Sequence, residues 1–238
     1  MSPGLTARLI ADNAGAWEAA VRSRFVDELL AGTVADDVLA RYLVQDYQFC
    51  DAFTALLGQG CASAPDLPER LVFARQLGMF ANDENSYFVD SFDALGVAES
   101  DRLRPPLHPA TRDFDALMRE ALASRSYPQV LAVLVVAERL YLDWATRPDA
   151  AGLRATRPEH VGWVDLHRGL AFEAWVAWLT DRLDAHAPTD AAELQAVADL
   201  FARAVACEVA FFDAAYDAAA YDDAAHHEAP SELAAPRS

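Results

Sequence analysis

The chain has 238 residues, enough for one large domain or two small ones with a full hydrophobic core. Hydrophobic residues make up 53% of it and charged residues 24%, a balance that excludes intrinsic disorder over most of the length. Acidic residues outnumber basic residues 37 to 19, and the resulting net charge of −18 repels a phosphate backbone or an anionic membrane surface. We therefore expect neither a nucleic-acid partner nor a membrane partner.

The basic residues are all arginine, and the lack of lysine removes Schiff-base chemistry and the Walker phosphate loop from consideration. The three cysteines, Cys50, Cys61 and Cys207, are far apart and have no CxxC spacing, so they predict neither a disulfide framework nor a zinc site. The first fifteen residues contain no apolar signal-peptide core, and no apolar run approaches the roughly 20 residues that span a bilayer. Together these features predict a cytoplasmic protein.

Apolar residues recur along the chain with the 3.6-residue period of amphipathic helices. A first helix is predicted over residues 14–30. A second begins at the acidic pair Asp36–Asp37, which suits the positive end of a helix dipole, and extends to about Leu56. A third is predicted over residues 68–95 and ends before Gly96, because glycine favours the left-handed conformation that follows many helices.

The proline-rich residues 104–109 predict a linker in the middle of the chain. The second half then carries four predicted helices, over residues 110–124, 128–145, 158–185 with a break at Gly169, and 190–223. Pro128 and Pro158 fall in first turns, where proline is tolerated. Residues 226–238 are polar and contain proline, so we predict a flexible C-terminal tail there.

Seven to eight helices with short connections predict a compact all-α bundle. We assign residues 1–225 to a single all-helical domain and residues 226–238 to the tail. Gly58 and Gly60 follow no predicted strand, so they do not indicate a nucleotide-binding loop. They either allow two helices to approach closely or end the second helix.

Three carboxylates interrupt apolar helix faces, where an unpaired charge is costly. Asp46 lies between Tyr42 and Phe49 on the second helix. Glu138 directly follows the apolar run 130–137, which is typical of a central buried helix. Glu208 lies in an aromatic part of the last helix. Burial raises the pKa of a carboxyl group and makes it an effective general acid or base.

A cavity containing these carboxylates would suit a planar, nitrogen-containing ligand, because carboxylates accept N–H groups and rings stack on aromatic walls. The aromatic residues available as walls are Phe49, Tyr141, Trp163 and Phe212. Structural explanations also remain open. Asp46 lies on the surface if the helix register is shifted by one residue, and Glu138 could pair with an arginine such as Arg139.

Two other chemistries find less support. A di-iron bundle needs Glu-x-x-His pairs on two helices, and none of the six histidines follows a glutamate at that spacing. The sequence contains no Gly-x-Ser-x-Gly elbow, and the three cysteines fall on ordinary helix faces or ends. We therefore predict no metal, no cofactor and no covalent nucleophile.

Three segments together resemble the TenA (thiaminase II) family. They are residues 41–49 (RYLVQDYQF), residues 163–167 (WVDLH) and residues 208–216 (EVAFFDAAY), and the likeness extends from about residue 14 to residue 217. The resemblance implies a haem-oxygenase-like all-α fold that holds no haem, and a homo-oligomer, either a dimer or a tetramer. It also implies hydrolysis of thiamine or of aminopyrimidine breakdown products during thiamine salvage.

In the better-known branch of that family a cysteine on the central helix is the nucleophile. Here the matching position is Glu138, so the chain resembles the branch in which glutamate replaces cysteine. By this resemblance Glu208 and Glu138 are the catalytic carboxylates. Asp46 would bind the pyrimidine ring nitrogen and amino group, and the remaining substrate-binding residues would be Phe49, Tyr141, Trp163, His167 and Phe212.

Two positions depart from the family pattern. His167 replaces a tyrosine of the family, and Arg112 aligns with another tyrosine near the start of its helix. Both changes would alter the polarity of the pocket and with it the substrate.

The leading hypothesis is a hydrolase of an aminopyrimidine or formylaminopyrimidine that activates water with carboxylates. The alternatives are a non-catalytic binder of a small planar metabolite, a non-haem iron oxidase of the same fold, and a helical interaction module with no cavity. Some members of the family are labelled transcriptional regulators, but the acidic charge does not favour DNA contact.

Overall fold

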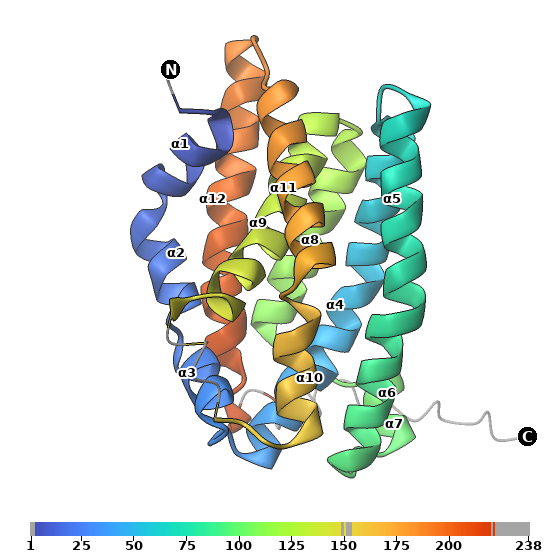
Figure 1. Ribbon diagram of the computed structural model, residues 1–238, viewed down its shortest axis with the longest axis vertical. Helices are drawn as coiled ribbons and strands as arrows, with labels where there is room; N and C mark the ends of the chain where they lie inside the picture. Colours follow the sequence, from blue (N-terminus) through green and yellow to red (C-terminus); the bar gives the residue numbers. More distant parts are fainter. Residues whose placement is uncertain (1–2, 149, 151–153, 220, 222–238) are drawn as a thin grey trace, which may run out of the picture.

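The computed structural model describes residues 3–148, 150, 154–219 and 221 (Figure 1). Within those residues every regular element is helical, and eight of the helices are long, which confirms the predicted all-α bundle. None of the described helices is long and apolar enough to cross a membrane. The predicted flexible tail at residues 226–238 lies outside the described residues.

The N-terminal part contains three short helices instead of one long one: α1 (Leu5–Asp12), α2 (Ala14–Val21) and α3 (Arg24–Ala31). The prediction of a single helix over residues 14–30 was wrong because Ser23 is in an extended conformation and caps α3. Its hydroxyl accepts a hydrogen bond from the backbone N–H of Val26. Serine is a preferred N-cap because it satisfies one of the free donors of the first turn.

Helix α4 (Asp36–Ser63) is longer than predicted, so neither Gly58 nor Gly60 ends it. Gly60 instead lets α5 (Leu67–Met79) approach, since a Cβ atom there would lie 2.5 Å from a ring carbon of Phe73. A Cβ at Gly58 would meet nothing within 4 Å. The close helix approach is thus a property of Gly60 alone.

The predicted third helix at residues 68–95 is divided in two by a π-helical turn, Phe80–Glu84, between α5 and α6 (Asn85–Ala94). Such turns are rare and occur often at functional sites, because the extra residue turns side chains toward a new direction. Gly96 adopts the left-handed conformation at φ +70°, as predicted. The short helix α7 (Glu99–Leu103) and the proline-rich linker follow.

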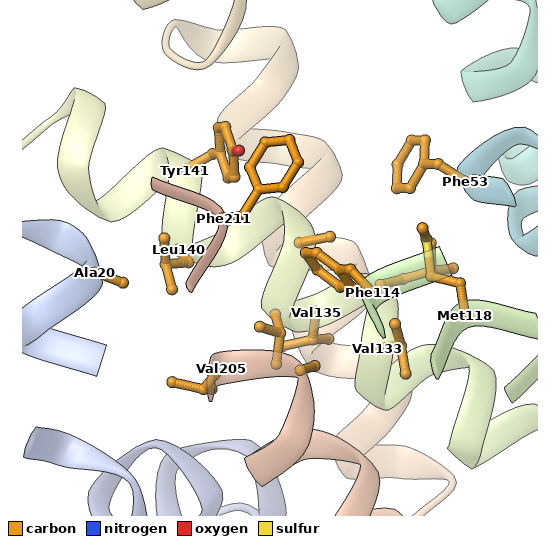
Figure 2. Packing of buried hydrophobic residues seen from close by; sticks show 14 of the residues in the cluster. Ala20, Phe53, Phe114, Met118, Val133, Val135, Leu140, Tyr141, Val205 and Phe211 are labelled. Atoms are coloured by element: carbon orange, nitrogen blue, oxygen red, sulfur yellow. The ribbon is translucent and has the colours of Figure 1, made fainter. Parts of the chain in front are cut away.

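Helix α9 (Tyr127–Ala145) is the central helix, and it contacts α2, α4, α8 (Pro109–Ser124), α11 and α12. Figure 2 shows the packing: Val133 and Val135 of α9 lie near Phe114 and Met118 of α8, and Leu140 faces Ala20 of α2. The apolar run at residues 130–136 is fully buried, as its composition predicts. The central position of Glu138, two residues further along, follows from it.

The predicted helix at residues 158–185 breaks at Gly169, whose φ of +92° suits glycine, into α10 (Pro158–Leu166) and α11 (Leu170–Ala185). Helix α12 (Ala191–Ala214) packs along α9 and ends nine residues before its predicted end. Buried side chains from α1 to α12 form one hydrophobic core.

Candidate active site

A cavity of about 220 Å³ opens beside α9, between α4, the π-helical turn and the junction of α10 and α11. The walls that face it are largely aromatic, and they carry acidic groups. Its lining residues include Asp46, Phe49, Cys50, Phe53, Phe80, Asp83, Glu84, Glu138, Tyr141, Trp163, Asp165, His167, Arg168 and Phe172. An interaction module without a cavity does not fit this arrangement.

Asp46 projects from α4 into the cavity and is only 5% exposed. It makes no hydrogen bond or ion pair with any described residue. Burial raises the pKa of its carboxyl group to about 8. An aspartate in this state is available to a ligand that supplies N–H groups. The surface location left open by the sequence does not apply.

Glu138 reaches the cavity from the end of the apolar part of α9 and is 6% exposed. One carboxylate oxygen accepts a hydrogen bond of 2.8 Å from the indole N–H of Trp175 on α11. Burial raises the pKa of Glu138 to about 7, although the Trp175 hydrogen bond favours the ionised form. The group can therefore both take and release a proton near neutral pH. Arg139 pairs with Asp143 instead, on its own helix.

Glu84, in the last position of the π-helical turn, is a third carboxyl group lining the cavity, and the sequence analysis missed it. Burial, and then the charges of Glu138 and Asp46, raise its pKa well above the usual range. A sequence signal was available. Glu84 lies four residues after Phe80 and four before Phe88, the same interruption of an aromatic face that singled out Asp46.

Glu208 on α12 is 1% exposed, and neither of its carboxylate oxygens has a hydrogen-bond partner among the described residues. Burial raises its pKa well above the usual range, and the charge of Asp46 raises it further. It does not line the cavity. The structure therefore brings Asp46 and Glu138 together around one cavity and leaves Glu208 behind its wall.

A pair of tyrosines is close to Glu208 and reaches the cavity through one of its members. The hydroxyl groups of Tyr42 and Tyr141 are 2.8 Å apart, and only Tyr141 lines the cavity. The negative charge of Glu208 helps to raise the pKa of both tyrosines, for which burial is the first cause. Phe212 stacks on Tyr42 with ring planes 5° apart and stays outside the lining, so it supports the wall instead of forming it.

Trp163 and His167, both on or just after α10, form the wall beside Tyr141. Their rings are 4.4 Å apart, and the His167 ring is 4.7 Å from that of Tyr141. Burial lowers the pKa of His167 to about 4, so the imidazole is neutral at pH 7. Its Nδ1 lies 2.7 Å from the Trp163 carbonyl oxygen, which fixes the ring. Phe49 lines the cavity from α4 as predicted for a wall.

Two sequence-based expectations need correction. Cys50 does not lie on an ordinary helix face, because it lines the cavity. Burial, with the charges of Asp46 and Glu84, raises its pKa well above the usual range, so it is a thiol and a weak nucleophile. Arg112 does not change the pocket polarity, because it lies outside the lining and donates to the carbonyl oxygen of Leu107.

The donor set does not resemble a metal centre. Among the described residues no group of three or more His, Cys, Asp or Glu side chains could hold a metal ion. What the cavity offers is three carboxyl groups with raised pKa values and flat aromatic walls. Such an arrangement can bind N–H groups and move protons.

A model of the TENA/THI-4/PQQC family matches residues 11–218 of the chain. No functionally curated protein matches the sequence. Among solved structures, a TenA family transcription regulator from a Silicibacter species aligns with a TM-score of 0.79 and 20% identity, over 89% of this chain and 96% of its own.

Two further structures extend the comparison. A candidate TenA-like thiaminase from Sulfolobus solfataricus aligns with a TM-score of 0.74 and 13% identity, over 90% of this chain and 96% of its own. A domain of unknown function from Shewanella denitrificans with a heme oxygenase-like fold aligns with a TM-score of 0.67 and 16% identity, over 97% of this chain and 98% of its own. At such identities these structures establish the haem-oxygenase-like fold alone. The family match covers nearly the whole length, and the chain therefore belongs to the TENA/THI-4/PQQC family.

Proposed function

We propose that this protein hydrolyses an aminopyrimidine or formylaminopyrimidine produced by the breakdown of thiamine. The observation that carries the proposal is a small cavity in which carboxyl groups with raised pKa values face aromatic walls. A planar heterocycle fits between such walls, and its ring nitrogen and amino group match carboxyl partners. Membership of a family that includes thiaminase II-like hydrolases supports the same reaction class.

In this proposal Asp46 binds the substrate. Its carboxyl group has no partner among the described residues, so a ligand that supplies an amino N–H and a ring nitrogen completes its hydrogen bonds. Phe49, Tyr141 and Trp163 hold the ring by stacking and edge contacts. His167, neutral at pH 7, adds a polar edge without adding charge.

Glu138 activates water. The ionised carboxylate removes a proton from a water molecule whose oxygen forms the new C–O bond as the C–N bond breaks, and one proton returns to the leaving nitrogen. The resemblance also assigns a catalytic role to Glu208. Because Glu208 does not line the cavity but its charge acts on Tyr42 and Tyr141, we assign it a positioning role that acts through these tyrosines.

Thiamine itself is a less suitable substrate than its degradation products. Cleavage at the thiazolium is usually assigned to a cysteine nucleophile, and the resemblance assigns Glu138 to that position in this chain. The one cysteine of the described lining, Cys50, is held as a thiol. The name of the Silicibacter relative concerns regulation, but the net charge of −18 does not favour DNA binding by this chain.

The test is turnover of formylaminopyrimidine and of the aminopyrimidine by the purified protein, with thiamine as a comparison substrate. We expect release of formate or ammonia from the first two and none of the thiazole from thiamine. Glu138→Gln should lose turnover while it still binds the ring. Thermal stabilisation of the wild-type protein by both pyrimidines without any product would instead identify a binding protein.

A further inference from the structure

We propose that Glu84 is a second catalytic residue, the general acid that protonates the leaving nitrogen opposite the base Glu138. The inference rests on the proposed function, in which no residue is yet assigned as the proton donor to the leaving nitrogen. Its evidence is the position of Glu84 in the cavity, the backbone that holds it there, and the groups that surround it.

Glu84 and Glu138 reach the same cavity from different elements, the π-helical turn and α9. Glu84 forms no hydrogen bond or ion pair with any other described residue, whereas Glu138 is held by Trp175. A carboxyl group turned into a cavity without a protein partner is available to a ligand. Of the two glutamates, Glu138 is therefore held in place and Glu84 is available to a ligand.

The π-helical turn is the reason that Glu84 reaches this place. Its five residues interrupt the regular α-helical register between α5 and α6, and Phe80, Asp83 and Glu84 all line the cavity. A π turn costs hydrogen-bond geometry relative to an α-helix, so its presence at the cavity wall is consistent with a functional demand.

The surroundings favour the protonated form of Glu84. From α4 it faces Asp46 and the thiol of Cys50, and from its own turn Asp83. The far side of the cavity contributes Tyr141 of α9, and Asp165, neutral His167 and Arg168 from the end of α10. Arg168 is the one cation among the described lining residues, and it pairs with Asp165. The negative charges of Glu138 and Asp46 thus oppose ionisation of Glu84.

The excess of acidic groups around Glu84 gives the two glutamates different roles, Glu84 as the acid and Glu138 as the base. Burial raises the pKa of Glu138 to about 7, and burial with neighbouring charge raises that of Glu84 well above its usual range. Glu138 therefore exchanges its proton near neutral pH, whereas the surroundings of Glu84 favour its protonated form. Two carboxyl groups whose surroundings separate their pKa values are a recurrent pattern of acid and base assignment.

The step balances between these two groups. Glu138 takes a proton from water, the water oxygen bonds to the substrate carbon, and the C–N bond breaks with its electron pair on nitrogen. Glu84 gives its proton to that nitrogen, and the two glutamates exchange one proton through solvent before the next cycle. The net reaction is addition of one water molecule across the C–N bond.

The experiment is the pH profile of kcat/KM for formylaminopyrimidine with wild-type protein, Glu84→Gln and the matched control Asp90→Asn. Asp90 is an exposed carboxylate on α6, outside the cavity lining. Wild type should give a bell-shaped profile whose alkaline limb reports Asp46 and Glu84 together and has the steepness of two ionisations. Glu84→Gln should lose on the order of 10² in kcat with a smaller change in KM, and its alkaline limb should keep the steepness of one ionisation, that of Asp46. Asp90→Asn should keep both limbs.

Binding of 4-aminopyrimidine across the same pH range tests Glu84 even if no substrate is turned over. Binding to the wild type should weaken at alkaline pH as Asp46 and Glu84 ionise, and binding to Glu84→Gln should weaken less steeply, through Asp46 alone. An alkaline limb of unchanged steepness and position in Glu84→Gln, in either measurement, overturns the inference. If Glu84→Gln does not fold, Glu84→Asp keeps the carboxyl group one methylene shorter. It should keep an alkaline limb with the steepness of two ionisations and a lower kcat, and a limb with the steepness of one ionisation in folded Glu84→Asp overturns the inference as well.

Discussion

Glu69 and the cavity glutamate Glu138 are buried and the cavity glutamate Glu84 is half-buried, but what mainly separates them is the groups around them. Glu69 on α5 accepts hydrogen bonds from the Tyr127 hydroxyl at 2.6 Å and from Arg182 at 3.1 Å, and it contacts His186 at 3.3 Å. Burial alone raises the pKa of Glu69, but these partners together lower it below its usual value. Glu138 has only the indole N–H of Trp175 and Glu84 has no partner among the described residues, and the pKa values of both rise.

The difference teaches how to separate a structural carboxylate from a functional one. Its hydrogen-bond partners make Glu69 a tie between α5, α9 and α11, and they already occupy both of its oxygens. The cavity carboxyls retain oxygens that a ligand can use, at a cost in folding free energy, which is typical of active sites. The two regions should therefore respond to substitution in opposite ways.

Glu138→Gln should show the largest effect. Removing the base should lower kcat for formylaminopyrimidine by about 10² to 10⁴, while the unfolding free energy stays the same or increases because a buried ionisable group becomes neutral. Steady-state kinetics and denaturant unfolding check this. Glu208→Gln should lose less, since Glu208 acts through the tyrosine pair. Equal turnover in Glu138→Gln and wild type would remove the proposed mechanism.

Glu69→Gln should show the reverse behaviour, with a stability loss of about 1–2 kcal/mol and little change in kcat. The expected loss is small because Arg182 and His186 are about one third exposed, and solvent weakens their attraction to Glu69. The pKa of Glu69 is lowered in the folded state, so its contribution is present at neutral pH and is lost as the pH falls through that lowered value. The unfolding curves of Glu69→Gln and the wild type should therefore differ at pH 7 and approach each other at pH 3.

Asp46→Asn should change the pH dependence of stability in the opposite direction. Since burial raises the pKa of Asp46 to about 8, folding takes up a proton between about pH 4 and 8, and wild-type stability falls as the pH rises through that range. At pH 8 the variant should be more stable by at least about 1.4 kcal/mol, the equivalent of one pKa unit. The advantage should vanish near pH 4. Parallel stability curves for the two proteins would contradict the burial argument.

Cys50→Ser should show the smallest effect, a loss in kcat within about tenfold, far below that of Glu138→Gln. The raised pKa of Cys50 predicts slow alkylation by iodoacetamide at pH 7 and faster alkylation as the pH rises. Cys61, which is half-buried where Cys50 is buried, provides the internal control for reagent reactivity. Loss of all turnover in Cys50→Ser, with Glu138→Gln active, would assign the chemistry to the thiol.

Much of the bundle could be predicted because its signals are local. The apolar run at residues 130–137 determines a buried central helix, and Gly169 and Gly96 mark helix ends through their conformational freedom. The N-terminal helices were harder to predict. A serine such as Ser23 caps a helix only where the chain turns, and its presence in the sequence does not show the turn. The apolar residues on either side of Ser23 keep the 3.6-residue period, so they predict one helix.

The site was only partly predictable. Asp46, Glu138 and the ring residues Phe49, Tyr141 and Trp163 interrupt or line helix faces, so periodicity pointed to them, and all five line the cavity. The same reasoning could not separate Glu208, which faces inward as strongly but stays behind the wall. Facing the interior is a property of one helix, whereas lining a cavity depends on several helices at once.

By itself the sequence determined the helical class, the central helix, the acidic surface and the types of residue available for chemistry, because these depend on composition and local periodicity. The tertiary structure decided which carboxyl groups meet and in which protonation state. Glu84 reaches the cavity through a π-helical turn. Glu69 has a structural role instead, because Tyr127 and Arg182 donate hydrogen bonds to it from other helices. The pKa of a carboxyl group depends on the solvent and charges that the whole fold places around it.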